Sequence, residues 1–301
     1  MIPALRLTLS PHAGGLRALR AGEAGPGVDA MMLGRPVEDV LRLLPAVFGL
    51  CRSVQETALA LALDRAPPDP EGLRRDMIRD HLARFCLHLP RALGLLPMPL
   101  PQGWMRGGAV LRQALFGADG LPAPSGFEQW LLQGQGAAPV VAAVMQTFAP
   151  FEAATLLPPL DPIAPFARDA VENALIARHG SHPLLAHVVI SHGRGPLAHL
   201  VARLVDLDAL SRGGMPAARR LADGTALVPC SRGLCALRLR VAGGMVTGFD
   251  RRTPTDHLLM PGGLMEASLA RLPAAKAGAA PLLAAILDPC VPVMIEGGLH
   301  A

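Results

Sequence analysis

Apolar residues recur with a helical period over most of the chain. Between Pro36 and Leu63 they predict one helical segment, which Pro45 and Gly49 should kink or divide. Similar patterns predict helices over residues 71–89, 105–116, 126–132, 140–148, 166–179, 196–210, 264–272 and 281–287. Stretches rich in proline and glycine separate several of these segments. The chain should therefore be mainly helical.

Alternating patterns typical of strands occur in two places. The first is Leu5–Leu9, and the second comprises residues 235–241 and 245–249, joined by a turn at Gly243 and Gly244. No internal repeat is visible. The predicted fold class is mainly α (α+β), a helical core with small antiparallel β elements near the N-terminus and at about 235–249.

Composition narrows the range of partners. Of the 301 residues 51% are hydrophobic, yet no apolar run reaches the length that spans a bilayer. The first fourteen residues lack the pattern of a secretion signal, so we expect a cytoplasmic protein without a membrane partner. All basic residues except Lys276 are arginine, and they are scattered without aromatic platforms. This distribution argues against nucleic acid as a partner.

The five cysteines occur at irregular spacing, and their odd number argues against a disulfide framework. Cys86 lies in a predicted helix, and Cys230 and Cys235 lack the close spacing of a zinc site. We interpret these three as buried structural thiols. Cys51 and Cys290 stand in more constrained contexts, described next.

Six short motifs follow one another in a fixed order. They are the segment Gly34-Arg35 to Cys51, Gly195-Pro-Leu-Ala198, Ser231-Arg-Gly233, Thr253-Pro-Thr255, Glu266-Ala-Ser-Leu269, and Asp288-Pro-Cys290-Val-Pro-Val293-Met-Ile-Glu296. In this order they resemble the large subunit of nickel–iron hydrogenases. The resemblance covers residues 31–56 and 193–296. It implies one large-subunit-like domain over residues 1–301, with a shortened, divergent middle region at about 57–192.

The departures from that family concern its metal ligands. The family holds nickel and an Fe(CN)2(CO) unit on four cysteine thiolates and places a histidine near the end of the last motif. Here Phe48 and Val293 replace two of the cysteines, and Glu296 stands in place of the histidine. The resemblance leaves Cys51 and Cys290 as metal ligands.

Two further residues match positions that bind the cyanides in the family. The resemblance implies that Arg232 and Thr255 hydrogen-bond the cyanide groups of the iron unit. The cyanides and thiolates would bring negative charge into a poorly solvated pocket, and a guanidinium is suited to balance that charge. With two thiolates missing, a nickel site should be weak, and the sequence leaves open whether nickel accompanies the iron.

Catalysis is not expected. Residues 10–19, where the family places its proton-relay glutamate, contain no carboxylate, and we expect no removable extension after Glu296. These features resemble the hydrogenase accessory proteins called HupK or HoxV. The implied function is a non-catalytic maturation factor, a scaffold or chaperone that carries the iron unit. Its implied partners are other hydrogenase maturation proteins and the apo large subunit.

Three alternatives remain. One is a metal-free structural subunit related to the quinone-site subunit of respiratory complex I, although such a subunit has no use for Cys51 and Cys290. Another is a divergent hydrogenase. The last is nickel storage by the histidines between residues 179 and 199; their spacing fits no helical face, and Pro183 and Gly193 interrupt them, which favours a solvated loop cluster.

Overall fold

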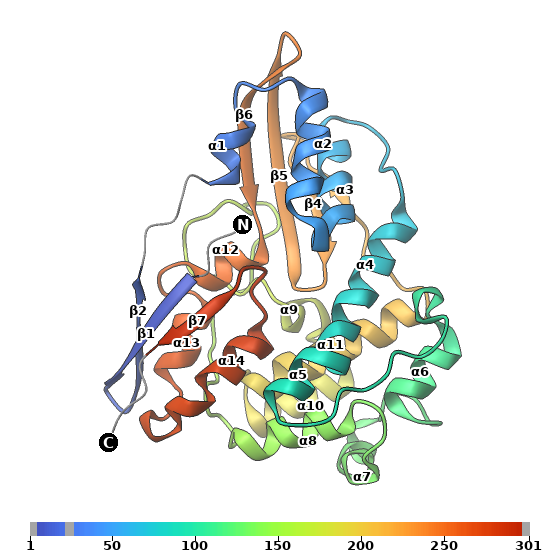
Figure 1. Cartoon of the computed structure of the whole chain (residues 1–301), viewed down its shortest axis with the longest axis vertical. Helices are drawn as coiled ribbons and strands as arrows, with labels where there is room; N and C mark the ends of the chain where they lie inside the picture. The colour runs from blue at the N-terminus through green and yellow to red at the C-terminus, as the bar shows by residue number, and fades with distance from the viewer. Residues whose placement is uncertain (1–4, 22–26, 297–301) are drawn as a thin grey trace.

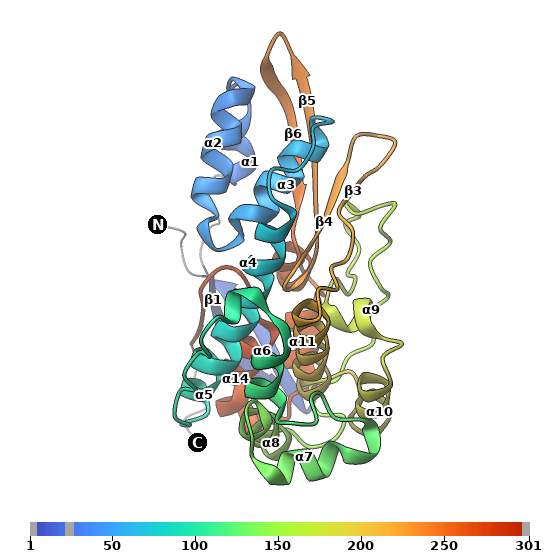
Figure 2. The same ribbon diagram turned by 90° about the vertical axis from the view of Figure 1, so that its right-hand side faces the viewer.

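The computed structural model describes residues 5–21 and 27–296. Its helices and strands pack around two hydrophobic cores. In Figure 1 the smaller core lies at the top, between a sheet and the first helices, and the larger lies below, among the remaining helices. Figure 2 shows the same two parts from the side.

Helix α11 (Pro196–Ser211) forms the centre of the larger core. Most of its residues are buried, as expected of a helix surrounded by protein, and the buried residues include the charged Arg203 and Asp206. It contacts α4 (Pro70–Ala83), α6 (Gly108–Phe116), α8 (Ala138–Thr147), α9 (Leu175–His179), α10 (Pro183–His192) and α14 (Ala280–Leu287). The shorter helices of this part are α5 (Leu89–Ala92), α7 (Phe127–Gln133), α12 (Pro254–Leu259) and α13 (Leu264–Ala270).

Two predictions in this region were wrong. The helix predicted over 166–179 begins only at Leu175. The preceding residues form turns and an isolated β-bridge, in which Glu172 exchanges backbone hydrogen bonds with Pro158 and Leu160. Helix α10 was not predicted at all. Pro183 stands in its first turn, where proline is tolerated, and therefore starts this helix rather than interrupting one.

A three-stranded sheet joins the two ends of the described chain. The predicted N-terminal strand is confirmed as β1 (Leu5–His12), which forms an antiparallel hairpin with β2 (Gly15–Ala21). On its other side β1 pairs in parallel with β7 (Val293–Glu296), so the strand order is β2-β1-β7. Strand β7 was not predicted, since a four-residue strand carries little pattern of its own.

A four-stranded antiparallel sheet forms one wall of the smaller core. Its order is β3 (Arg219–Arg220), β4 (Ala226–Cys230), β5 (Gly233–Ala242), β6 (Met245–Arg252), which extends the predicted strand pair. It packs with α1 (Val28–Met32), α2 (Val37–Val47) and α3 (Arg52–Ala62). Cys230 and Cys235 are buried in this sheet and Cys86 in the larger core, which confirms their interpretation as buried thiols.

Over residues 5–21 and 27–296, no single helix has the length and apolarity needed to cross a bilayer. One pair of helical segments, Pro254–Ala270 and Ala274–Leu287, reaches that length only together and is bent by 113° at its break.

Candidate functional site

Cys51 lies where the first helical segment divides. Helix α2 ends before Phe48, whose carbonyl accepts a hydrogen bond of 2.8 Å from the amide of Cys51, and α3 begins at the next residue. The predicted break occurs at Gly49, whereas Pro45 stays inside α2. Burial raises the pKa of the Cys51 thiol to about 12, although the positive charge of Arg232 opposes that rise. Without a metal, Cys51 is therefore a neutral thiol.

Cys290 follows the turn at the end of α14. Asp288 ends that helix in the left-handed conformation, with φ 56° and ψ 61°, and redirects the chain toward β7. The amide of Cys290 then donates a hydrogen bond of 2.9 Å to the hydroxyl oxygen of Thr255. Thr255 lies in the first turn of α12, which Thr253 and Asp256 cap reciprocally. The Thr255 hydroxyl accepts this bond and still has its own proton to donate.

Arg232 occupies the tight turn between β4 and β5. Gly233 permits this turn, because its φ is +153° and a Cβ there would lie 2.4 Å from the side-chain oxygen of Asn173. Asn173 holds the turn through two hydrogen bonds of 2.8 Å to the backbone of Leu234. The Arg-Gly motif therefore has a structural reason. The glycine lets Asn173 approach the turn, and Asn173 in turn fixes the backbone from which the side chain of Arg232 extends.

The side chain of Arg232 points inward and pairs with two carboxylates. It forms ion pairs with Asp80 and Asp288, and its Nε donates a hydrogen bond of 2.9 Å to the carbonyl of Asp288. Asp80 also accepts a 2.5 Å hydrogen bond from the hydroxyl of Ser231. Burial raises the pKa of Asp80, but Arg232 and Ser231 outweigh that effect and hold it below its usual value. These contacts fix the guanidinium in one position.

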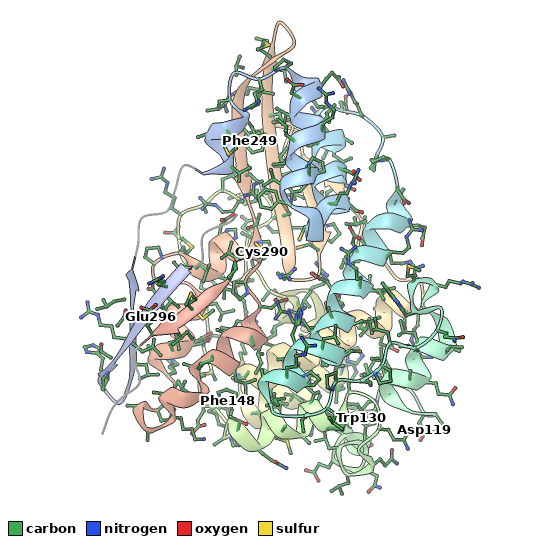
Figure 3. All side chains as sticks on the ribbon, viewed as in Figure 1. Asp119, Trp130, Phe148, Phe249, Cys290 and Glu296 are labelled. Carbon is green, nitrogen blue, oxygen red and sulfur yellow. The ribbon has the colours of Figure 1, made fainter. Side chains whose placement is uncertain are left out.

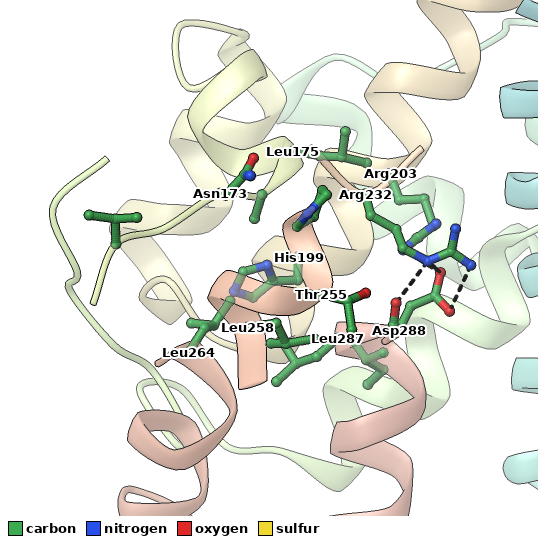
Figure 4. Close-up of a pocket in the computed structure, with 14 residues that line it drawn as sticks. Asn173, Leu175, His199, Arg203, Arg232, Thr255, Leu258, Leu264, Leu287 and Asp288 are labelled. Carbon is green, nitrogen blue, oxygen red and sulfur yellow. Dashed lines mark hydrogen bonds and ion pairs between the residues drawn. The ribbon is translucent and has the colours of Figure 1, made fainter. Parts of the chain in front are cut away.

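Sequence reasoning missed most of this charged cluster. Asp288 also pairs with Arg203, at 3.1 Å, and with Arg84, so three guanidinium groups meet at one carboxylate. Figure 4 shows Arg203, Arg232 and Asp288 at this meeting point. We call Asp80, Arg84, Arg203, Arg232 and Asp288 the arginine–aspartate cluster. The one signal for it was Arg203, a charge inside the apolar pattern of residues 196–210.

The structure brings the predicted site residues together. Arg232 and Cys290 both lie near enough to Cys51 to act on its pKa, the arginine lowering it and the second thiol raising it. Arg232 and Cys290 also line one groove of about 370 Å³. Figure 3 shows Cys290 at the junction of the upper and lower parts of the molecule, between the two cores. Thr255 joins this group through its hydrogen bond to Cys290.

A second, smaller cavity lies beside Arg232 and Asp288. It has a volume of about 30 Å³, and its polar lining includes Thr255, Asn173 and His199 (Figure 4). That volume accommodates roughly one or two small molecules the size of water. The cavity therefore provides room for a small ligand next to the hydroxyl of Thr255 and the guanidinium of Arg232.

The residues that replace the hydrogenase ligands have other contacts. The ring of Phe48 lies under the guanidinium of Arg251, with 4.4 Å between the guanidinium carbon and the ring centroid. Val293 begins β7 and lines the same groove as Cys290. Glu296 is exposed and lies 3.4 Å from Arg6.

The histidines between residues 179 and 199 do not converge. His179 ends α9, His187 and His192 belong to α10, and His199 belongs to α11, so most are helical rather than in a loop. His179 is bound to Asp206 at 2.7 Å. Across the described ranges, no group of three or more His, Cys, Asp or Glu side chains could hold a metal ion. The arrangement gives nickel storage by this cluster no support.

The amino-acid sequence is similar to that of a known protein. The chain is 45% identical over 274 residues to the hydrogenase expression/formation protein HupK of Rhodobacter capsulatus, and the match covers 91% of each chain. No family model matches the sequence.

Similar solved structures are hydrogenases. The reduced nickel–iron–selenium hydrogenase of D. vulgaris Hildenborough superposes with a TM-score of 0.56 at 14% identity, covering 94% of each chain. The reduced, active nickel–iron–selenium hydrogenase of Desulfomicrobium baculatum gives a TM-score of 0.53 at 12% identity, covering 94% of this chain and 95% of the other. The predicted resemblance to a hydrogenase large subunit is therefore confirmed at the level of the fold.

Proposed function

Because the chain belongs to the HupK family of hydrogenase expression/formation proteins, we propose that it is a carrier in hydrogenase maturation. In this proposal Cys51 and Cys290 bind an Fe(CN)2(CO) unit as cargo and hold it until it passes to the apo large subunit. The proposal is supported chiefly by two observations: Cys290 and the buried guanidinium of Arg232 line one groove, and both lie close enough to Cys51 to act on its pKa.

Two thiolates are a sufficient ligand set for such a cargo. Soft sulfur ligands suit low-valent iron, and an iron that already carries three diatomic ligands needs few protein donors. Binding replaces two S–H bonds by two Fe–S bonds, while the labile ligands of the iron leave and two protons pass to solvent. The iron keeps its oxidation state, so the step needs neither an oxidant nor a reductant.

Arg232 and Thr255 are suited to bind the cyanide groups. Asp80 and Asp288 hold the guanidinium of Arg232 in place, so little conformational freedom is lost when cargo binds. The hydroxyl of Thr255 accepts a hydrogen bond from Cys290 and can donate one to a cyanide nitrogen. Both side chains line the cavity of about 30 Å³, which gives a diatomic ligand a place to lie.

We further propose that the protein does not turn over hydrogen. Phe48 and Val293 leave two thiolates where an active large subunit uses four, and these two residues have other contacts here. The role of a carrier then requires a donor of the iron unit among the maturation proteins and an acceptor, the apo large subunit. We propose the cytoplasm as the place of this exchange.

The experiment uses the full chain purified without oxygen from hydrogenase-producing cells. We expect iron in the protein and infrared bands of bound cyanide and carbon monoxide. Cys51→Ala and Cys290→Ala should each lose both signals. Cys86→Ala is the matched control, because Cys86 is a buried thiol within the larger core and should leave the signals intact.

One result would overturn the proposal. If the wild-type protein is iron-free while other maturation proteins from the same cells carry the iron unit, the chain is not its carrier. A metal-free structural role would then account better for the fold.

A further inference from the structure

The groove beside Cys290 has two charged residues in its lining, both arginines. Its volume is about 370 Å³, and apart from Arg84, Arg232 and Cys290 its lining consists of alanine, proline, valine and isoleucine side chains. The side chain of Arg232 is 8% exposed, whereas that of Arg84 is 18% exposed. Arg84 is thus the more accessible of the two guanidinium groups that a solute meets in this groove.

A local irregularity of the helix places Arg84 there. Helix α4 ends at Ala83, and residues Arg84–His88 form a turn of π-helix before α5 continues. Such π-helical turns are rare and are frequently found at functional sites. The guanidinium of Arg84 pairs with Asp288, two residues before Cys290 in the chain.

The arginine–aspartate cluster carries more positive than negative charge. Its three guanidinium groups face two carboxylates, which leaves one positive charge in excess. The nearby Asp206 does not offset this excess, because it is already paired with Arg178 at 3.0 Å. A poorly solvated excess charge is costly, so the cluster favours an incoming anion.

We propose that Arg84 is the receiving group for the cargo: it attracts the cyanide-bearing iron unit into the groove while a further anionic ligand on the iron makes the unit an anion, and it orients the unit toward Cys290. The charges of iron(II) and two cyanides cancel, so this additional ligand supplies the negative charge, and it leaves when the thiolates bind. This inference rests on the proposed function. A guanidinium offers several N–H donors in a fixed plane, to which cyanide nitrogens can bind. Arg84 makes no bond to the iron. It acts before the Fe–S bonds form, and Arg232 binds the unit once it has moved inward.

The test measures loading of the purified full chain without oxygen. The probe is a synthetic iron(II) complex that carries two cyanides and carbon monoxide and has labile ligands at its other positions, at least one of them a halide, so that the complex is an anion. The infrared bands of the bound probe are followed over time. We expect Arg84→Gln to load roughly tenfold more slowly than wild type, the scale on which a single steering charge acts. Arg84→Lys, which keeps the charge, should recover most of the rate.

The matched control is Arg91→Gln, an exposed arginine on the neighbouring α5, which should load like wild type. Salt provides a readout that a merely structural role of Arg84 would not change. Wild-type loading should slow as ionic strength rises, and Arg84→Gln should respond less.

The possible failures can be told apart. If the wild type takes up no iron from the probe or in cells, the proposed function is wrong. If the wild type loads but Arg84→Gln loads as fast as Arg91→Gln, the receiving role of Arg84 is wrong. If Arg84→Gln does not fold, the wild-type protein alone still tests the inference. Wild-type loading that does not depend on ionic strength would overturn it.

Discussion

The amide of Cys290 donates a hydrogen bond of 2.9 Å to the hydroxyl oxygen of Thr255, which joins two motifs that lie 35 residues apart in the sequence. Thr255 is fixed by the capped first turn of α12, and the bond therefore sets the position of the cysteine backbone. A candidate cyanide-binding residue thus also positions a candidate iron ligand.

Replacing this hydroxyl should affect both stability and cargo. Thr255→Val keeps the shape of the side chain but leaves the half-buried amide of Cys290 without its acceptor, and we expect a loss of about 1 kcal/mol in the free energy of unfolding. Thr255→Ser, which keeps the hydroxyl, is the matched control. Urea unfolding measures the stability, and infrared spectroscopy of loaded protein measures the cyanide bands. Equal stability and equal band positions in both variants would contradict the assignment.

Removing the guanidinium of Arg232 should be costly. Arg232→Gln leaves Asp80 without its ion-pair partner and Asp288 with two guanidinium groups instead of three. Breaking a buried pair in this way costs about 3–5 kcal/mol, which chemical unfolding would detect. Arg271→Gln, at an exposed position, should change the free energy of unfolding by less than about 0.5 kcal/mol. Similar stabilities of the two variants would show that Arg232 contributes no net stabilisation.

Stability should depend on pH through His199. Burial, with Arg194 and Arg203 nearby, lowers the pKa of His199 from its usual 6.5 to about 3. Between these values the unfolded chain binds a proton that the folded protein does not. The free energy of unfolding should therefore fall as the pH drops from 6.5 toward 3, by up to about 1.4 kcal/mol per pH unit from this group. In His199→Gln the slope over that range should be shallower, as followed by urea unfolding at several pH values; an unchanged slope would mean that His199 is protonated in the folded state.

The turn that presents Arg232 should tolerate no side chain at Gly233. A Cβ there would lie 2.4 Å from the side-chain oxygen and 2.6 Å from the backbone oxygen of Asn173, at a φ of +153°. We expect Gly233→Ala to lower the free energy of unfolding by roughly 1–3 kcal/mol. Gly49→Ala is the control, because no atom lies within 4 Å of its added Cβ. Thermal unfolding that ranks the two variants equally would show that the turn can open without cost.

The sequence by itself determined the residues that match family motifs. Cys51, Cys290, Arg232 and Thr255 each lie in a short motif, and the order of the motifs indicated one fold. Helices and strands with a strong local period were predicted for the same reason, since a few neighbouring residues contain the pattern. Arg232 lines one cavity with Thr255 and one groove with Cys290, which agrees with the prediction that these three residues share a site.

The tertiary structure alone decided the arginine–aspartate cluster and the pairing of the two ends. Asp80 and Arg84 look like ordinary charged residues of a helix, and their partners lie more than 150 residues away in the sequence. Strand β7 gains its structure from β1, at the opposite end of the chain. Local periodicity reports only which face of an element is apolar. The pairing of charged side chains depends on how whole helices and strands pack against one another. That packing is determined by the complete hydrophobic core.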